Sequence, residues 1–323
     1  MKIDIYTHIA PPKYKSFVGK ISPSIEDHLN RVHTLYNIEE RFRVLDKFSD
    51  VRQVLTLAMT AASILEDNKI GVDLAKKAND EIAEIVLRYP DRFIAGIASS
   101  SLSSIDEAIK EIDRAIKELK LKGLQLFFPY GGKIWDIETF TPIFKKMCEV
   151  DLPIWIHPAI PINRRDYEKY FIDHVFGWPY ESTVAMVHLV FQGVIEKFPN
   201  LKILIHHCGA MVPFFGERIK EAYNASKIIH GMDFEAKLSQ HPIEYFKMFY
   251  TDTAIGGSTS GLMCGYNFFG SDHLLFGTDM PYDSEYGAKT IKLSIESIEK
   301  MPIDEEEKRK IFEFNAKKLL KIS

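Results

Sequence analysis

The sequence predicts an α/β protein that folds as a single (β/α)₈ TIM-type barrel over residues 1–323. Three observations predict it: eight short apolar segments, helical patterns between them, and no second compositional block along the chain. Short apolar segments bounded by turn residues are typical of buried parallel strands, and strands that alternate with helices indicate repeated βα units. With 323 residues, 46% of them hydrophobic, the chain can bury the core of one barrel or of two smaller domains.

Each predicted strand is a short run of apolar residues. The eight strands are Ile3–Tyr6, Val51–Leu57, Phe93–Ala98, Gly123–Phe127, Leu152–Ile156, Lys202–His206, Met248–Asp252 and His273–Phe276. The helical patterns are Asn68–Tyr89, Ile105–Leu119, Glu181–Phe198 and Asp304–Ile322. Ser104 is the expected N-cap of the second helix, because Glu107 follows three residues later and completes a capping box.

Two long segments interrupt the alternation and are predicted to be loops. The first is His8–Asn37, and the second is Pro158–Pro179, which is rich in aromatic and basic residues. Long loops in compact domains are usually functional, so we expect both to form walls or a lid over a pocket. A contact between subunits is the alternative for either loop.

Charge and cysteine content limit the possible partners. The net charge is -4 and the pI is near 6.3, so electrostatics gives no reason to expect nucleic acid or an anionic membrane as a partner. No apolar stretch approaches the roughly 20 residues that span a bilayer, and the start Met1-Lys2-Ile3-Asp4 does not have the pattern of a signal peptide. Cys148, Cys208 and Cys264 form an odd, widely spaced set. We therefore expect a cytoplasmic protein with reduced thiols.

Four polar residues stand at or just past the ends of predicted strands. They are His8, His157, His207 and Asp279. In a (β/α)₈ barrel the loops after the carboxyl ends of the strands build the active site, so these four side chains should converge. Three histidines and one carboxylate offer enough nitrogen and oxygen donors for a divalent metal. The sequence therefore predicts an enzyme with a small metal-centred pocket.

A family resemblance runs nearly end to end. The motifs that carry it are Ile3-Asp4, Pro90-Asp91-Arg92-Phe93, Lys122-Gly123-Leu124-Gln125-Leu126, Ile156-His157-Pro158-Ala159, Gly177-Trp178-Pro179-Tyr180-Glu181, Phe198-Pro199-Asn200-Leu201, His207-Cys208-Gly209, Gly277-Thr278-Asp279-Met280-Pro281 and Asn315-Ala316-Lys317-Lys318-Leu319. Each motif is weak alone, but their order and spacing make a strong signal. The chain resembles the amidohydrolase superfamily and, within it, the branch of aminocarboxymuconate-semialdehyde decarboxylase and the resorcylate-type decarboxylases.

The resemblance implies a role for each strand-end residue. His8 matches the second histidine of the His-x-His pair and His157 the histidine of the fifth strand, both of which are metal ligands in the family. His207 matches the sixth-strand histidine that acts on substrate or on metal-bound water. Asp279 matches the eighth-strand aspartate that contacts the metal and shuttles protons. No role is transferred to His206, which stands where the family usually has a small residue.

Tyr6 departs from the family pattern, since relatives have histidine or glutamate there. A neutral phenol with a pKa near 10 is a poor zinc ligand, although a bound cation can lower that pKa, and tyrosinate ligates iron in some proteins. His8, His157 and Asp279 alone give three ligands with open positions, as in catalytic zinc sites. We expect one divalent metal, zinc first and manganese second, with Tyr6 as a further ligand. A branch with weakened or absent metal is the rival reading. Lys122 is no counterpart of a bridging carboxylated lysine, so a binuclear site is not expected.

The resemblance implies a metal-dependent, non-oxidative decarboxylase for a small aromatic or conjugated carboxylic acid. His207 and Asp279 would be its catalytic residues. Arg164 and Arg165 would bind a second anionic group of the substrate through bidentate contacts, unless they belong to a plain solvated turn. A hydrolase or hydratase that uses the same residues is the alternative, and a non-catalytic, metal-free binding barrel is a third. The resemblance also implies a homodimer.

Overall fold

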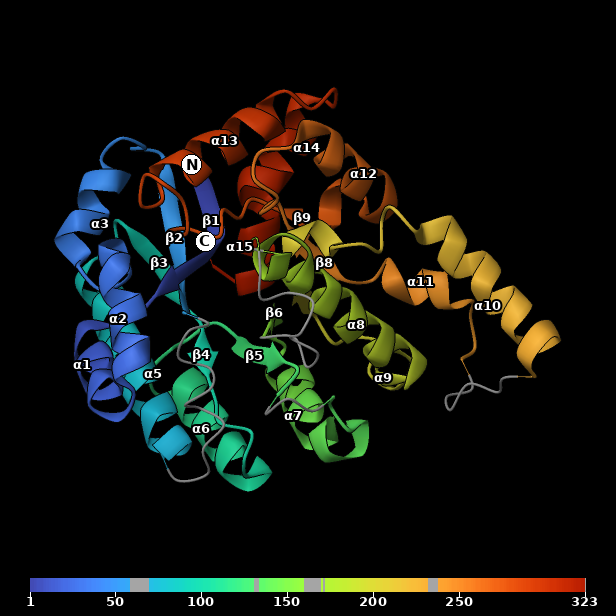
Figure 1. Ribbon diagram of the computed structural model, residues 1–323, viewed down its shortest axis with the longest axis horizontal. Coiled ribbons are helices and arrows are strands. Elements are labelled where there is room, and N and C mark those ends of the chain that lie inside the picture. Colours follow the sequence, from blue (N-terminus) through green and yellow to red (C-terminus); the bar gives the residue numbers. More distant parts are fainter. Residues whose placement is uncertain (59–69, 131–133, 160–169, 171, 232–237, 323) are drawn as a thin grey trace.

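The computed structural model describes residues 1–58, 70–130, 134–159, 170, 172–231 and 238–322 (Figure 1). Its strands are parallel, and each pairs with the next in chain order within two sheets, β1-β2-β3 and β4 to β9. The strands are β1 (Lys2–Ile9), β2 (Val51–Leu57), β3 (Phe93–Gly96), β4 (Ala98–Ser99), β5 (Leu124–Phe128), β6 (Ile154–Pro158), β7 (Ile203–Ile205), β8 (Tyr250–Asp252) and β9 (Leu274–Leu275).

Backbone hydrogen bonds join the two sheets into a closed barrel. At one seam the Ile97 amide donates to the Leu55 carbonyl at 2.9 Å, so the predicted third strand is a single pass divided into β3 and β4. At the other seam the Ile5 amide donates to the Phe276 carbonyl at 2.8 Å, and Thr7 forms a parallel bridge with Met280. Closure removes the unpaired strand edges that an open sheet would expose. The predicted eight-stranded barrel is confirmed.

Helices surround the strands on the outside (Figure 1). Within the described part of the chain none of them is both long and apolar enough to cross a membrane. They are α1 (Pro12–Ile21), α2 (Pro23–Arg31), α3 (Ile38–Leu45), α5 (Ile70–Arg88), α6 (Ile105–Lys117), α7 (Ile137–Val150), α8 (Trp178–Phe191), α9 (Val194–Lys197), α10 (Gly216–His230), α11 (Pro242–Phe246), α12 (Thr259–Phe269), α13 (Ala288–Glu299), α14 (Glu305–Arg309) and α15 (Asn315–Leu320).

Two layers of apolar side chains hold the barrel together. One large cluster lies between the strands and the helices and includes Ile203 and Ile205 of β7. A second cluster contains Ile5, Trp155 and Leu204, which come from strands around the barrel. The indole of Trp155 on β6 donates to the carbonyl of Ile5 on β1 at 3.3 Å. Because β6 and β1 are not neighbours, the second cluster fills the barrel interior, as is usual for this fold.

The expectation that His8–Asn37 is a loop is wrong. This segment continues β1 and then forms α1, α2 and a short 3₁₀ turn, His33–Leu35. Its prolines suggested a loop, but Pro12 and Pro23 are each the first residue of a helix. Proline suits that position because its fixed φ is helical and its missing N–H would have no intrahelical partner there.

Three further helix predictions are confirmed in place but differ in detail. Ser104 caps α6 by accepting from the Glu107 amide at 3.4 Å, while the Glu107 carboxylate pairs with Lys110. The predicted helix Glu181–Phe198 is divided into α8 and α9, because Gly193 has a φ of 77°. The predicted helix Asp304–Ile322 consists of α14, a π-helical turn (Lys310–Phe314) and α15.

Glu81 of α5 stabilises the segment after β1. Its two carboxylate oxygens accept from the amides of Lys13 and Tyr14, both at 2.8 Å, at the start of α1, which has no side-chain cap of its own. We expect Glu81→Ala to lower the free energy of unfolding by about 2 kcal/mol, since two amides lose a buried charged acceptor. Urea denaturation checks this result. Glu84 lies on α5 like Glu81 but makes an exposed ion pair with Lys13. Glu84→Ala is therefore the control, and it should change the free energy of unfolding little. Equal losses in both variants would contradict the capping role.

Candidate metal centre

Four donor side chains converge at the carboxyl end of the barrel. His8 lies on β1, His157 on β6, His206 directly after β7, and Asp279 beyond β9. One ligand atom from each of the four lies within 4.8 Å of those of the other three. This grouping joins three of the four metal ligands predicted from the sequence with His206, to which no role had been given.

Strand alternation explains why these histidines point inward. Leu204 belongs to the interior cluster, and His206 follows it two residues later, so both lie on the same side of the strand. The same spacing joins Trp155, also in the interior cluster, to His157. His206 could therefore have been found from the sequence by the period of its strand.

Hydrogen bonds orient two of the imidazole rings so that Nε2 is available as a donor atom. Nδ1 of His157 lies 2.6 Å from the Pro158 carbonyl, which can only accept, so Nδ1 carries the hydrogen. Nδ1 of His8 lies 3.2 Å from the Thr56 hydroxyl. The Thr56 hydroxyl donates its one hydrogen to the Thr7 carbonyl at 3.0 Å. It must therefore accept a hydrogen bond from Nδ1 of His8. In both rings the lone pair then belongs to Nε2.

The third ring, His206, lies between two carboxylates. Its Nδ1 bonds to Oδ2 of Asp252, at the end of β8, and its Nε2 lies 3.3 Å from Oδ1 of Asp279. Nε2 of His8 lies 2.9 Å from the same Asp279 oxygen. Neither Nε2 is aligned for a hydrogen bond, although both are buried. Two ring nitrogens that face one carboxylate oxygen without such alignment, with His157 in the same group of donors, fit a divalent metal.

The charges of the centre are strongly coupled. Burial disfavours the charge of Asp279, but His206 and His8 outweigh it and hold the Asp279 pKa well below its usual range. Burial also opposes protonation of His206, yet Asp252 and Asp279 raise its pKa to about 10. Burial, reinforced by the neighbouring His8 and His206, holds the His157 pKa well below its usual range. Metal binding at this centre therefore has to release the His206 proton.

Tyr6 is fully buried beside the metal centre. Its ring stacks on the His206 imidazole, with 4.0 Å between ring centroids and 18° between the planes. The hydroxyl is buried without a hydrogen-bond partner. Burial, reinforced by Asp252 and Asp279, raises the Tyr6 pKa well above 10. The side chain is thus a neutral phenol whose ring packs against one face of the His206 ring.

His207 lies beside the donor group rather than in it. Its ring centroid is 3.9 Å from that of His206, and its φ of 60° breaks the extended course of β7. Burial and the charge of His206 lower the His207 pKa to about 3, so the ring is neutral. The predicted substrate-binding residues Arg164 and Arg165 lie outside the described residues.

Aromatic side chains form the surroundings of the donor group. Phe127, the next-to-last residue of β5, has its ring centroid 5.6 Å from that of His157. Trp178 lies 6.5 Å from the same ring, and Tyr282 lies 5.6 Å from His8. These aromatic side chains favour a flat ligand with apolar faces, because aromatic rings stack on one another with centroids 4.5–7 Å apart.

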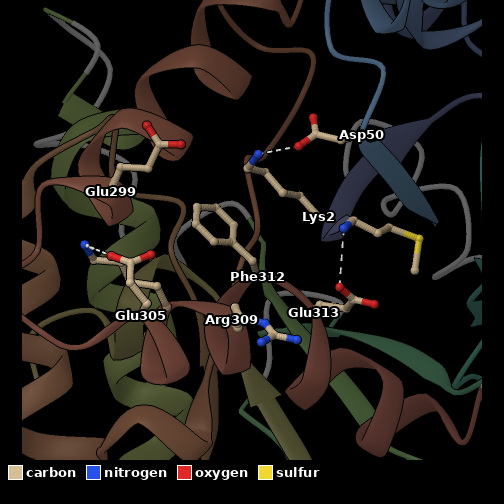
Figure 2. A pocket seen from close by; sticks show the side chains of 9 residues that line it. Lys2, Asp50, Glu299, Glu305, Arg309, Phe312 and Glu313 are labelled. Carbon is tan, nitrogen blue, oxygen red and sulfur yellow. Dashed lines mark hydrogen bonds and ion pairs between the residues drawn. The ribbon is translucent and has the colours of Figure 1, made fainter.

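A cavity of about 500 Å³ lies at the opposite end of the barrel, beside Lys2 at the start of β1 (Figure 2). Three ion pairs lie among its lining residues: Lys2 with Asp50, the amino terminus with Glu313, and Lys308 with Glu305. Phe312 also lines the cavity. This end carries a network of ion pairs and no part of the donor group. The catalytic face is the carboxyl end, as in other barrels of this kind.

Fold and donor set together define a class: a (β/α)₈ barrel with one divalent metal centre at the carboxyl ends of its strands. The particular family follows from comparison. A family model described as amidohydrolase matches residues 54–322. The chain belongs to this amidohydrolase family.

Curated relatives and solved structures agree with the assignment. The chain is 28% identical over 301 residues to 2-amino-3-carboxymuconate-6-semialdehyde decarboxylase of Dictyostelium discoideum, covering 87% of this chain and 82% of that protein. A dihydroxybenzoic acid decarboxylase from Polaromonas sp. JS666, solved with bound manganese and 2-nitroresorcinol, is 25% identical. It has a TM-score of 0.82 and covers 99% and 96% of the two chains. The 5-carboxyvanillate decarboxylase of Sphingomonas paucimobilis, at 23% identity, has a TM-score of 0.88 over 100% and 99% of the chains and shares the fold.

Proposed function

We propose that this protein is a metal-dependent, non-oxidative decarboxylase of a small aromatic or conjugated carboxylic acid. The observation that carries the proposal is the convergence of His8, His157, His206 and Asp279 at the carboxyl end of the barrel. Relatives that match most of the chain are named for this chemistry, among them a gamma-resorcylate decarboxylase from Polaromonas sp., 26% identical over 88% of this chain. Family and site therefore support the same reaction class.

The residues present fit one divalent ion. Nε2 of His8, His157 and His206 and a carboxylate oxygen of Asp279 would hold it. Tyr6, which the sequence predicted as a further ligand, is tested by the substitution described below. When bound, such an ion supplies positive charge that orients the substrate carboxylate and a neighbouring oxygen and withdraws electron density. We propose zinc, which suits imidazole and carboxylate donors. The manganese in the Polaromonas structure makes manganese the alternative.

Decarboxylation breaks the bond between the ring carbon and the carboxylate. Carbon dioxide leaves, the electron pair stays on the ring carbon, and that carbon takes up a proton. Because Asp279 is ionised, we propose that it relays this proton from water to the ring carbon, and that His207 assists the transfer. The low pKa of His207 keeps its ring neutral, so it would take part in the transfer as an uncharged imidazole.

The aromatic surroundings of the centre support a planar substrate. Phe127, Trp178 and Tyr282 have rings within 6.5 Å, centroid to centroid, of a metal-centre histidine. A benzoate or muconate ring can stack on such side chains while its carboxylate lies toward the donor group. Arg164 and Arg165 remain the residues predicted from the sequence to bind a second anionic group.

The experiment that tests this function is a substrate screen with product analysis. Hydroxybenzoates and amino-carboxymuconate semialdehydes are incubated with enzyme loaded with zinc or manganese, and released carbon dioxide is measured beside the remaining organic product. The proposal expects carbon dioxide and a product one carbon shorter, with His207→Asn retaining metal but losing most of the rate. Uptake of water with every carbon retained would instead establish the hydrolase or hydratase alternative.

Replacing Tyr6 tests its part in metal binding. Because the phenol is neutral and its pKa is raised, we expect Tyr6→Phe to keep the metal affinity within about threefold of wild type. Chelator competition with manganese and with zinc measures that affinity. A loss greater than about tenfold, which corresponds to about 1.4 kcal/mol, would establish the Tyr6 oxygen as a ligand despite its burial.

We also propose a homodimer in the cytoplasm. The homodimer rests on the family relation, and light scattering during gel filtration tests it. The reduced compartment is supported by Cys148, Cys208 and Cys264, which are all free thiols, as expected where glutathione keeps cysteines reduced.

A further inference from the structure

Asp252 is a buried carboxylate that the proposed reaction does not use. It ends β8 and is fully buried. Its Oδ2 bonds to Nδ1 of His206, and its Oδ1 accepts from the amides of Ala254 at 2.9 Å and Cys208 at 3.4 Å. A buried charge is expensive unless it is paired and hydrogen-bonded. Each oxygen of Asp252 is satisfied, so the carboxylate is held in one orientation.

The backbone next to Asp252 packs closely against the segment that follows β9. A side chain at Gly277, beyond β9, would bring a Cβ within 2.8 Å of the Asp252 Cβ. Thr253, the next residue, exchanges hydrogen bonds of 3.0 Å with both the amide and the carbonyl of Gly277. The ends of β8 and β9 are thereby fastened together two residues before Asp279.

His206 is held by a hydrogen bond at Nδ1, while its Nε2 lies near a second carboxylate without bonding to it. Nδ1 faces Asp252, and Nε2 faces Oδ1 of Asp279 at 3.3 Å. An imidazole that donates Nδ1–H to a carboxylate has its lone pair on Nε2, and this arrangement orients histidine ligands in metal sites generally. His8 and His157 obtain the same orientation from a hydroxyl and a carbonyl. Only His206 within the donor group has an anionic partner at Nδ1.

We infer that Asp252 is a positioning residue that fixes the His206 ring with Nε2 directed at the metal centre. It acts through His206 and touches neither metal nor substrate. The inference rests on the proposed function only in requiring that the centre binds a divalent ion. It does not depend on which acid is decarboxylated.

The test measures metal affinity in a double-mutant cycle. Asp252→Asn keeps the shape of the side chain but can present an N–H to Nδ1, which places the ring hydrogen on Nε2. We expect this variant to bind zinc and manganese about 10–100-fold more weakly in chelator competition. In a His206→Gln background the same substitution should have no further effect, because the two residues act as one unit.

Two comparisons separate positioning from other roles. Thr251 lies beside Asp252 on β8, and its hydroxyl donates a buried hydrogen bond of 2.9 Å to the Ile205 carbonyl on β7. Thr251→Val removes this bond, so it should lower the unfolding temperature without changing metal affinity. A plain electrostatic effect of the Asp252 charge would persist in the His206→Gln background. The inference is overturned if Asp252→Asn binds metal as wild type does, if its effect survives in that background, or if the wild type binds neither ion. A wild type that binds metal but releases no carbon dioxide counts against the proposed reaction alone.

Discussion

His157→Ala is expected to remove the metal and with it the activity. The substitution takes away one of four converging donors and leaves a buried space that alanine does not fill. Metal affinity should fall more than about 100-fold, because loss of a ligand should cost more than loss of a residue that only hydrogen-bonds to a ligand. Decarboxylation should slow by about 10³-fold or more, because a bound ion supplies several kcal/mol of charge stabilisation. Elemental analysis of protein purified without chelator, beside a rate assay, gives both quantities.

His273→Ala serves as the matched control for this experiment. His273 lies just before β9, where its Nδ1 contacts the Phe249 carbonyl at 3.1 Å, away from the donor group. That variant should retain metal and activity. Full metal content in His157→Ala would remove His157 from the ligand set, and a metal-free wild type that stays empty after reconstitution would overturn the metal-dependent reaction.

Asp279→Asn is expected to lower kcat by about 10²–10⁴-fold, the range over which a positioned proton donor or acceptor acts. The amide keeps the size of the side chain but can neither carry the negative charge nor shuttle a proton. It also removes the anion that both His8 and His206 face, so metal affinity should fall as well. Assays at saturating metal separate the two effects.

Asp283→Asn is the control for loss of a nearby carboxylate. Asp283 accepts from the amides of Glu285 at 2.6 Å and Thr290 at 2.8 Å and so supports the start of α13. Its replacement should reduce stability with little change in kcat. If Asp279→Asn, fully loaded with metal, kept kcat within about threefold of wild type, the proton would have to come from another group.

The sequence predicted the barrel well because the signals are local. Each strand is a short apolar run, and the order of strands follows chain order. The first loop was misjudged because proline marks both loops and helix starts, and only the helical context of Pro12 and Pro23 distinguishes them. The division of the third strand at Ile97 depends on hydrogen bonds to Leu55 on one side and, from Ala98, to Gly123 on the other, which no local pattern reveals.

Three of the four residues of the metal centre were predicted from the sequence, and the fourth, His206, was not. His8, His157 and Asp279 stand out by their position at strand ends. No role was given to His206 because it stands where the family usually has a small residue, yet the structure places it in the donor group. The role of Asp252 depends on a contact between β7 and β8, which the sequence alone does not show.

The seam between β1 and β9 has a consequence for how the enzyme is made. The first strand pairs with residues near the end of the chain, and the centre takes His8 from the former and Asp279 from beyond the latter. Contacts between distant parts of a chain form slowly, since the intervening loop must first be closed. A growing chain contains His8 and β1 long before it contains Asp279, which lies beyond β9. The complete group of four donors can therefore form only after β9 has been synthesised.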